Sequence, residues 1–168
     1  MPNRIVIKKL LKLIGAFFIC LCLSMSIAHN LNAQEKDDWT TPPKKVKIIF
    51  PQNGEKVGSK IIVNGKSKIS AGSHLWVLIH RKDLTDQWWP QNKPIIDPDG
   101  NWKSICSIGE ARDVGYDFEI AVASFDKNEE KQILEYHKIG KEFGQWLSIK
   151  FPKATSNIDI VVVKKVSH

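Results

Sequence analysis

Few side chains in this sequence have the types and spacing that catalysis needs. A nucleophilic Cys106 would require a nearby cation or helix N-terminus to lower its pKa, but it alternates with Trp102 and Ser104 and is expected to be buried on a strand. Asp117 and Glu119 could imitate the acid and base of a glycosidase. They are expected on the outward face of a strand, among solvated charges. The sequence therefore favours a protein that is not an enzyme, with a small hydrolase as a remote alternative.

Potential metal ligands do not have the spacing of a metal site. His74 and His80 point to the same face of one expected strand, but about 3.3 Å per residue places them about 20 Å apart, too far to share an ion. Asp97 and Asp99 beside Gly100 suggest a calcium loop, yet the glycine comes too early and no glutamate closes the loop. We expect no metal and no cofactor. The segment is interpreted as a hairpin turn, because Asp-Gly tolerates the positive φ that such turns need.

Aromatic residues are the remaining candidates for function. Trp88 and Trp89 are adjacent, so their rings face opposite ways on an extended chain. One ring is expected to be structural, and the other to contribute to a surface platform framed by Pro90 and the turn with Asp97 and Asp99. Exposed tryptophan rings stack on sugars and are enriched at protein interfaces. These five residues are the predicted ligand-binding set; the alternative is that a loop and a helix pack both rings.

Short segments of alternating apolar residues must position these side chains. The segment 74–81 is apolar on both faces, which predicts a central strand that is covered twice. Asp126 resembles a helix-capping residue, and the apolar spacing that follows predicts one short helix over about residues 128–139, with Gly140 as its C-terminal stop. About seven strands with frequent turns favour a mainly β, antiparallel sandwich with this helix inserted before the last strand.

A resemblance follows from "FPQNGEKV", "IIVNGKS" and "HLWVLI", which occur in that order. In this arrangement the chain resembles bacterial immunoglobulin-like modules of exported proteins, over about residues 46–125 and the final strand. The resemblance implies that Trp76 is the core tryptophan of the third strand. It also implies a disulfide between the sheets, for which Cys106 has no partner. "WWPQ" and "DPDGNW" are similar to segments of a bacterial family that carries no assigned function.

The N-terminus predicts export. Four basic residues and no acidic residue precede an apolar run that ends in small residues, as in a secretory signal peptide over residues 1–33. Residues 34–45 are interpreted as a flexible leader, and 46–168 as the folded domain. The expected location is secreted or periplasmic. A retained membrane anchor is the alternative, although the run is shorter than the roughly 20 apolar residues that span a bilayer.

Removal of residues 1–33 takes those four basic residues away and lowers the formal net charge from +7 to +3. Such a surface does not indicate a nucleic-acid partner. Membrane contact is expected only through an uncleaved signal segment. The sequence thus predicts a non-enzymatic binding or interaction module of the cell envelope, with an envelope protein or a glycan as partner. The alternative is a purely structural accessory domain of an envelope complex.

Overall fold

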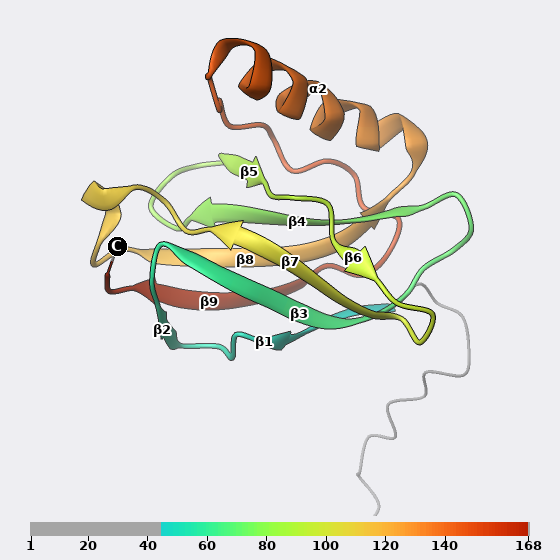
Figure 1. The fold of residues 1–168 in the computed structure, drawn as a ribbon, viewed down its shortest axis with the longest axis horizontal. Coiled ribbons are helices and arrows are strands. Elements are labelled where there is room, and N and C mark those ends of the chain that lie inside the picture. Colours follow the sequence, from blue (N-terminus) through green and yellow to red (C-terminus); the bar gives the residue numbers. More distant parts are fainter. Residues whose placement is uncertain (1–44, 168) are drawn as a thin grey trace, which may run out of the picture. The chain divides into compact units, whose positions relative to one another are not determined.

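The computed structural model describes residues 45–167, which form a mainly β architecture of two sheets and one α-helix (Figure 1). The four-stranded sheet has the strand order β1-β3-β7-β6. The five-stranded sheet has the strand order β2-β9-β8-β4-β5. Neighbouring strands are antiparallel except β2 and β9, which are parallel. The elements are β1 (Lys45–Phe50), β2 (Glu55–Val57), β3 (Lys60–Lys68), β4 (His74–Arg81), β5 (Trp88–Pro90), β6 (Ile95–Ile96), β7 (Asn101–Ser107), a 3-10 turn η1 (Ala111–Asp113), β8 (Asp117–Phe125), α2 (Lys127–Phe143) and β9 (Asp159–Lys165).

This architecture confirms the predicted class, mainly β with one helix. The described residues contain nine strands where about seven were expected. The strands that no sequence pattern marked are β2, β5 and β6, which have three, three and two residues. Segments this short cannot show a period-two pattern in the sequence, since the pattern needs at least four residues to be recognised. The predicted signal peptide, and the predicted leader except Lys45, lie outside the described residues.

The main core lies between the two sheets. Alternate residues of each strand point inward, as the period-two patterns predicted, and the buried thiol of Cys106 is among them. The cluster consists of Val46, Ile48, Val57, Val63, Leu75, Val77, Ile79, Trp102, Cys106, Ile108, Phe118, Ile120, Val122 and Val163. At about 25 cal/mol per Å² of buried apolar surface, this layer stabilises the pairing of the sheets without a disulfide.

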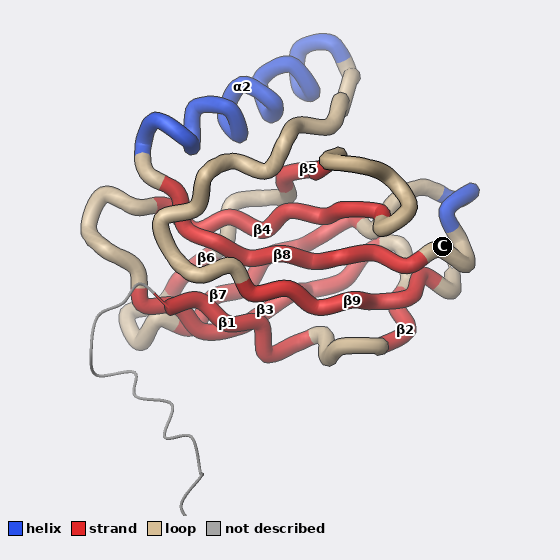
Figure 2. Tube along the Cα trace, turned by 180° about the vertical axis from the view of Figure 1, so that it is seen from behind, coloured by secondary structure: helices blue, strands red, loops and turns tan. Residues whose placement is uncertain are grey.

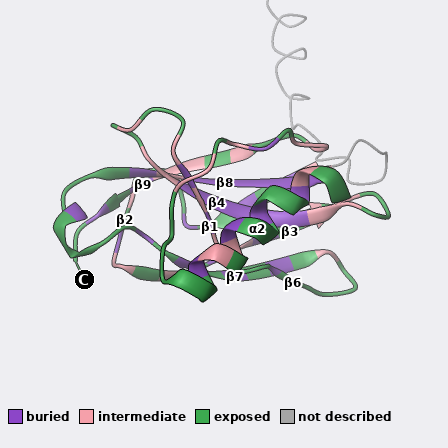
Figure 3. Cartoon of the chain, turned by 90° about the horizontal axis from the view of Figure 1, so that it is seen from above, coloured by how far each residue is buried: buried purple, intermediate pink, exposed green. Residues whose placement is uncertain are grey.

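A second cluster covers the other face of the five-stranded sheet. The connection that follows α2 runs across this face, and α2 itself lies beside the β5 edge of the sheet (Figure 2). Leu78, Ala121 and Phe125 from the strands meet Ile133 from the helix. Seen from the helix side, β8 is buried along most of its length (Figure 3). The prediction that residues 74–81 are covered on both faces is therefore confirmed.

Trp76 is buried in the core, as expected. It belongs to the cluster under α2 and lies opposite Ala123 on β8, while Trp102 is the tryptophan between the sheets. The small side chains of Ala121 and Ala123 leave the space that the indole ring needs on the helix side. On β4 the inward positions are held by aliphatic residues instead.

The helix begins as predicted and ends later. The side chain of Asp126 accepts hydrogen bonds from two backbone amides of the first turn, at 2.8 and 3.0 Å. The prediction that Gly140 stops the helix is wrong, because α2 continues to Phe143 and closes on Gly144 at φ 68°. Gly140 has a packing role: a side chain at this position would overlap the ring of Trp146. Within residues 45–167, no helix combines the length and the apolar character needed to cross a membrane.

Candidate functional site

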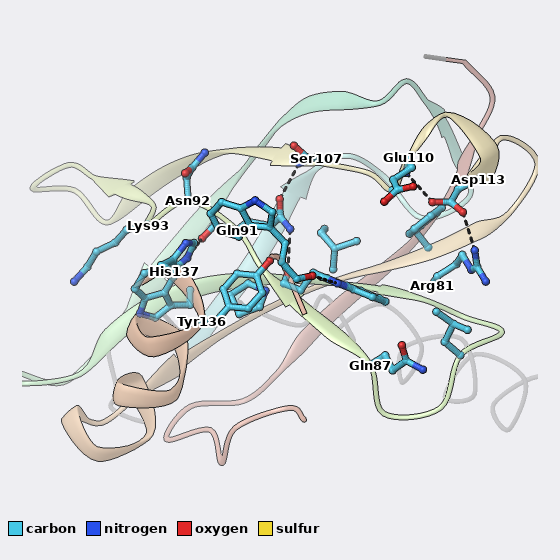
Figure 4. Close-up of a pocket in the computed structure, with 18 of the residues that line it drawn as sticks. Arg81, Gln87, Gln91, Asn92, Lys93, Ser107, Glu110, Asp113, Tyr136 and His137 are labelled. Carbon is cyan, nitrogen blue, oxygen red and sulfur yellow. Dashed lines mark hydrogen bonds and ion pairs between the residues drawn. The ribbon is translucent and has the colours of Figure 1, made fainter. Parts of the chain in front are cut away.

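A cleft of about 1090 Å³ opens along the edge where β5, the N-terminal end of η1 and the C-terminal half of α2 approach one another (Figure 4). Buried apolar side chains form its floor, and polar and charged side chains its rim. The lining residues are Trp76, Ile79, Arg81, Leu84, Gln87, Trp89, Pro90, Gln91, Asn92, Lys93, Ser107, Gly109, Glu110, Arg112, Asp113, Phe118, Leu134, Tyr136, His137, Lys141 and Trp146.

The strand β5 decides which of the adjacent tryptophans faces the cleft. Trp88 pairs with His80 and is buried on the helix side, where its ring packs edge-on against Phe151 at 4.8 Å between centroids. Trp89 pairs with Ile79, points the opposite way and remains partly exposed in the cleft. Its indole nitrogen donates to the carbonyl oxygen of Trp146 at 3.2 Å. The two rings thus have the opposite orientations that their adjacency predicted.

An aromatic wall comes from α2 and the segment after it. The ring of His137 stacks on Trp76 at 5.5 Å and meets Tyr136 at 5.1 Å. The ring of Trp146 lies 5.5 Å from Tyr136 and 6.0 Å from His137, and about half of its surface is exposed. Trp89 on β5 lines the same end of the cleft, so that several aromatic rings surround this part of it.

The two titratable rings at the aromatic end of the cleft, those of His137 and Tyr136, favour their neutral forms. Burial lowers the pKa of His137, although the carbonyl oxygen of Gln91 acts in the opposite direction. That oxygen lies 3.2 Å from Nε2, and because a carbonyl can only accept, it holds the proton on this nitrogen. Burial also raises the pKa of Tyr136 to about 12. Positive charge at this end comes from Lys93 and Lys141 on the rim.

Side-chain amides cover the open edge of β7 beside the cleft. The Gln91 side chain accepts from the Ser107 amide at 2.8 Å and donates to the carbonyl of Trp89 at 2.9 Å. The Ser104 hydroxyl donates to the carbonyl of Asn92 at 2.7 Å. The bond from the Ser107 amide satisfies a strand-edge donor that would otherwise attract another strand, and the other two bonds hold the rim residues in place.

The other end of the cleft carries an ordered ion-pair network. Arg81 donates to Asp113 at 2.7 Å, and the backbone amide of Glu110 donates to the same carboxylate at 2.6 Å. Burial acts to raise the pKa of Asp113, but the Glu110 amide and Arg81 hold it below its usual range. Lys165 is fully buried nearby and donates to the Glu110 carbonyl at 2.5 Å. All these charges have partners, which makes this end rigid and poorly suited to proton transfer.

The predicted site residues separate into two groups. Trp89 and Pro90 line the cleft, while Trp88 lies on the opposite side of β5 as a structural ring. Asp97 and Asp99 do not line it: their turn joins β6 to β7 as the hairpin that was predicted, and there the Ser67 amide donates to the Gly100 carbonyl at 2.8 Å. The turn therefore packs on β3, and the expected frame of Pro90 with this turn is corrected.

Catalytic and metal-binding alternatives gain no support from the described residues. Cys106 is buried and burial raises the pKa of its thiol to about 12. His74 and His80 are each paired with a different carboxylate, Glu130 and Glu119. In residues 45–167 no three His, Cys, Asp or Glu side chains are grouped to hold an ion.

Sequence reasoning missed the half of the cleft that α2 contributes. Tyr136, His137 and Trp146 are far from Trp89 in the chain, and only the docking of the helix brings them together. The sequence offered one local signal, the two adjacent rings of Tyr136 and His137 within the predicted helix. Neither protein-family models nor curated proteins yield a match to this chain.

Proposed function

We propose that this protein is an exported, non-enzymatic binding module of the cell envelope, with an immunoglobulin-like sandwich as its scaffold, and that its cleft binds a short segment of a glycan. The observation that carries this proposal is the cleft itself. Its volume of about 1090 Å³ is slightly above the usual range of ligand pockets, which is about 300–1000 Å³. Trp89 and Trp146 offer partly exposed rings to it from opposite elements.

The chemistry of the lining favours a sugar. The faces of tryptophan rings stack on the C–H surfaces of sugar rings, while amide and charged groups bond their hydroxyls. On the rim of the cleft, hydroxyl groups of a sugar could be bonded by Gln87 and Asn92, which are labelled in Figure 4, and by Lys141. The bonds of Gln91 to strand β7 speak against a peptide that would add as a further strand.

The absence of an activated group supports a binding role rather than catalysis. In the cleft, the Asp113 carboxylate already receives Arg81 and a backbone amide. A general base must reach the proton that it removes, and a carboxylate that is already held by two donors is poorly placed to do so.

Titration of the exported form with soluble oligosaccharides and with a peptide panel tests the proposal, with tryptophan fluorescence and calorimetry as readouts. Trp89→Ala is expected to weaken glycan binding about fivefold or more and to change stability little. Trp88→Ala is expected to lower stability by several kcal/mol, roughly 3–5, as a buried aromatic.

Phe143→Ala is the matched control, because this ring is 64% exposed and does not line the cleft. It should leave affinity unchanged. Saturable binding of a peptide in place of any glycan would show that the ligand class is wrong. Equal losses in Phe143→Ala and Trp89→Ala would show that the cleft is not the site.

A further inference from the structure

The outer face of the four-stranded sheet is strongly basic. On β1, β3 and β7, alternate side chains point away from the core, as their burial patterns show. The described strands of this sheet contain no aspartate or glutamate. The outward lysines are Lys45, Lys47, Lys60, Lys66, Lys68 and Lys103.

The strand register places like charges directly opposite one another. Lys45 pairs with Lys68 and Lys47 with Lys66 across β1 and β3. Directly opposed positions of these two strands thus carry charge of the same sign, which is an unfavourable arrangement in a sheet. Asp97 at the hairpin turn is near the edge of the face; hydrogen bonds from Asn101 chiefly lower its pKa, and the charge of Lys66 contributes.

Exposed apolar side chains lie between the lysines. Ile62 and Ile105 are directly opposite each other on β3 and β7, and are 54% and 58% exposed. Lys60 and Lys103 are two residues from them along the same strands and share their face. Ile95 on β6 lies opposite Lys103 and is also exposed. The face therefore combines positive charge with an apolar centre.

We propose that this face docks on the surface of an anionic lipid bilayer, with the lysines against the headgroups and the central isoleucines at the boundary of the acyl chains. The positive charge of the face matches the anionic headgroups, and its apolar centre matches the acyl chains. Lysines near such a surface and buried apolar area each add to membrane affinity. A nucleic acid or an acidic glycan would match the lysines alone, because the aliphatic side chains provide no ring for bases to stack on.

The layers of the domain make this docking compatible with an open cleft. The connection after α2 crosses the outer face of the five-stranded sheet (Figure 2), whereas the basic face belongs to the other sheet. A bilayer in contact with β3 and β7 would thus lie on the side of the domain opposite that connection. The docking proposal does not depend on the identity of any ligand in the cleft.

The test is co-sedimentation with vesicles of phosphatidylglycerol and phosphatidylcholine in equal parts, and with vesicles of phosphatidylcholine alone. A chain of residues 34–168 is suitable, because every side chain of both hydrophobic clusters lies within it. It also lacks the apolar N-terminal run, which would bind vesicles by itself. We expect binding to the anionic vesicles only, and weaker binding at high salt, where exposed charges are screened.

Two double variants separate the contributions. Lys60→Glu with Lys103→Glu should lower partitioning at least about 30-fold, given the usual contribution of each lysine near an anionic surface. Ile62→Ser with Ile105→Ser should lower it roughly tenfold through lost apolar contact. The matched control, Lys127→Glu with Lys131→Glu on the exposed side of α2, changes the net charge equally and should bind as the wild type does.

Thermal unfolding establishes that each variant is folded, and Lys60→Gln with Lys103→Gln replaces the charge reversal if that protein does not fold. Wild-type binding by the isoleucine variant would overturn the bilayer proposal, because lysines alone then suffice and the face is a site for soluble polyanions. Equal loss in the α2 control would also overturn it, since net charge rather than this face would then govern binding. Absence of wild-type binding to the anionic vesicles would do the same.

Discussion

Replacement of Glu130 tests how the helix is held on the sheet. This carboxylate projects from α2 into the cluster below it and is only 3% exposed. One oxygen accepts from the Trp76 indole at 3.1 Å and from the Lys93 ammonium at 3.1 Å, and the other is bonded to the His74 ring. The site joins the first half of α2 to β4 and to the connection after β5, which leads into the cleft.

The magnitude follows from these partners. Glu130→Gln keeps the shape but removes the charge, so hydrogen bonds of about 1.5–3 kcal/mol become neutral ones of about 0.5–1.5 kcal/mol. Lys93 is more than half exposed, so its share is discounted for solvent screening. The buried bond to Trp76 carries most of the effect. We expect the free energy of unfolding to fall by about 2 kcal/mol at neutral pH.

The pH dependence has a definite sign. Burial acts to raise the pKa of Glu130, but Lys93, His74 and Trp76 together hold it below its usual value. A carboxyl group whose pKa is lowered by folding stabilises the folded state. This stabilisation is complete above the pKa of the unfolded chain, about 4.3, and is lost as the pH falls through the lower pKa of the folded state. The difference between wild type and Glu130→Gln should therefore shrink from neutral pH to about pH 3.

Urea unfolding at both pH values measures this difference. Glu135→Gln is the control on the same helix, because Glu135 is exposed and 3.9 Å from Lys138; such surface pairs contribute about 0.5 kcal/mol or less. A Glu130→Gln effect as small as that of the control would refute the reasoning. A large effect that is equal at both pH values would show that shape, and not the ionised carboxylate, holds the helix.

Three further predictions concern the cores and the helix end. Trp76→Ala should lower the free energy of unfolding by about 3–5 kcal/mol, and a loss below about 1 kcal/mol in urea unfolding would contradict its core position. Cys106 should react slowly with thiol reagents in the native protein and rapidly in denaturant, because burial raises its pKa to about 12; equal rates would contradict its burial. Gly140→Ala should not give the gain of about 1 kcal/mol expected from helix propensity, because the methyl group displaces the ring of Trp146; increased quenching of tryptophan fluorescence by acrylamide would report that displacement.

The elements of the fold were largely predictable from local patterns. Alternation marked β1, β3, β7 and β8, because a side-chain period of two is a property of the strand itself, and apolar runs marked β4 and β9. The start of α2 was visible in Asp126, since capping is a contact between near neighbours. The end of α2 was not, because Gly140 is required by a ring six residues later in the chain, and such a contact leaves no local pattern.

The candidate site divides in the same way. The sequence by itself determined that Trp88 and Trp89 face opposite sides, because adjacent residues of a strand must do so. Only the tertiary structure decided that Trp88 is the structural ring, since this depends on which face of β5 is covered by the connection to β9. It also decided that Tyr136, His137 and Trp146 join Trp89, and that the turn with Asp97 does not. Those contacts depend on how the helix and the two sheets dock, and docking is set by the packing of many distant side chains rather than by any local stretch of residues.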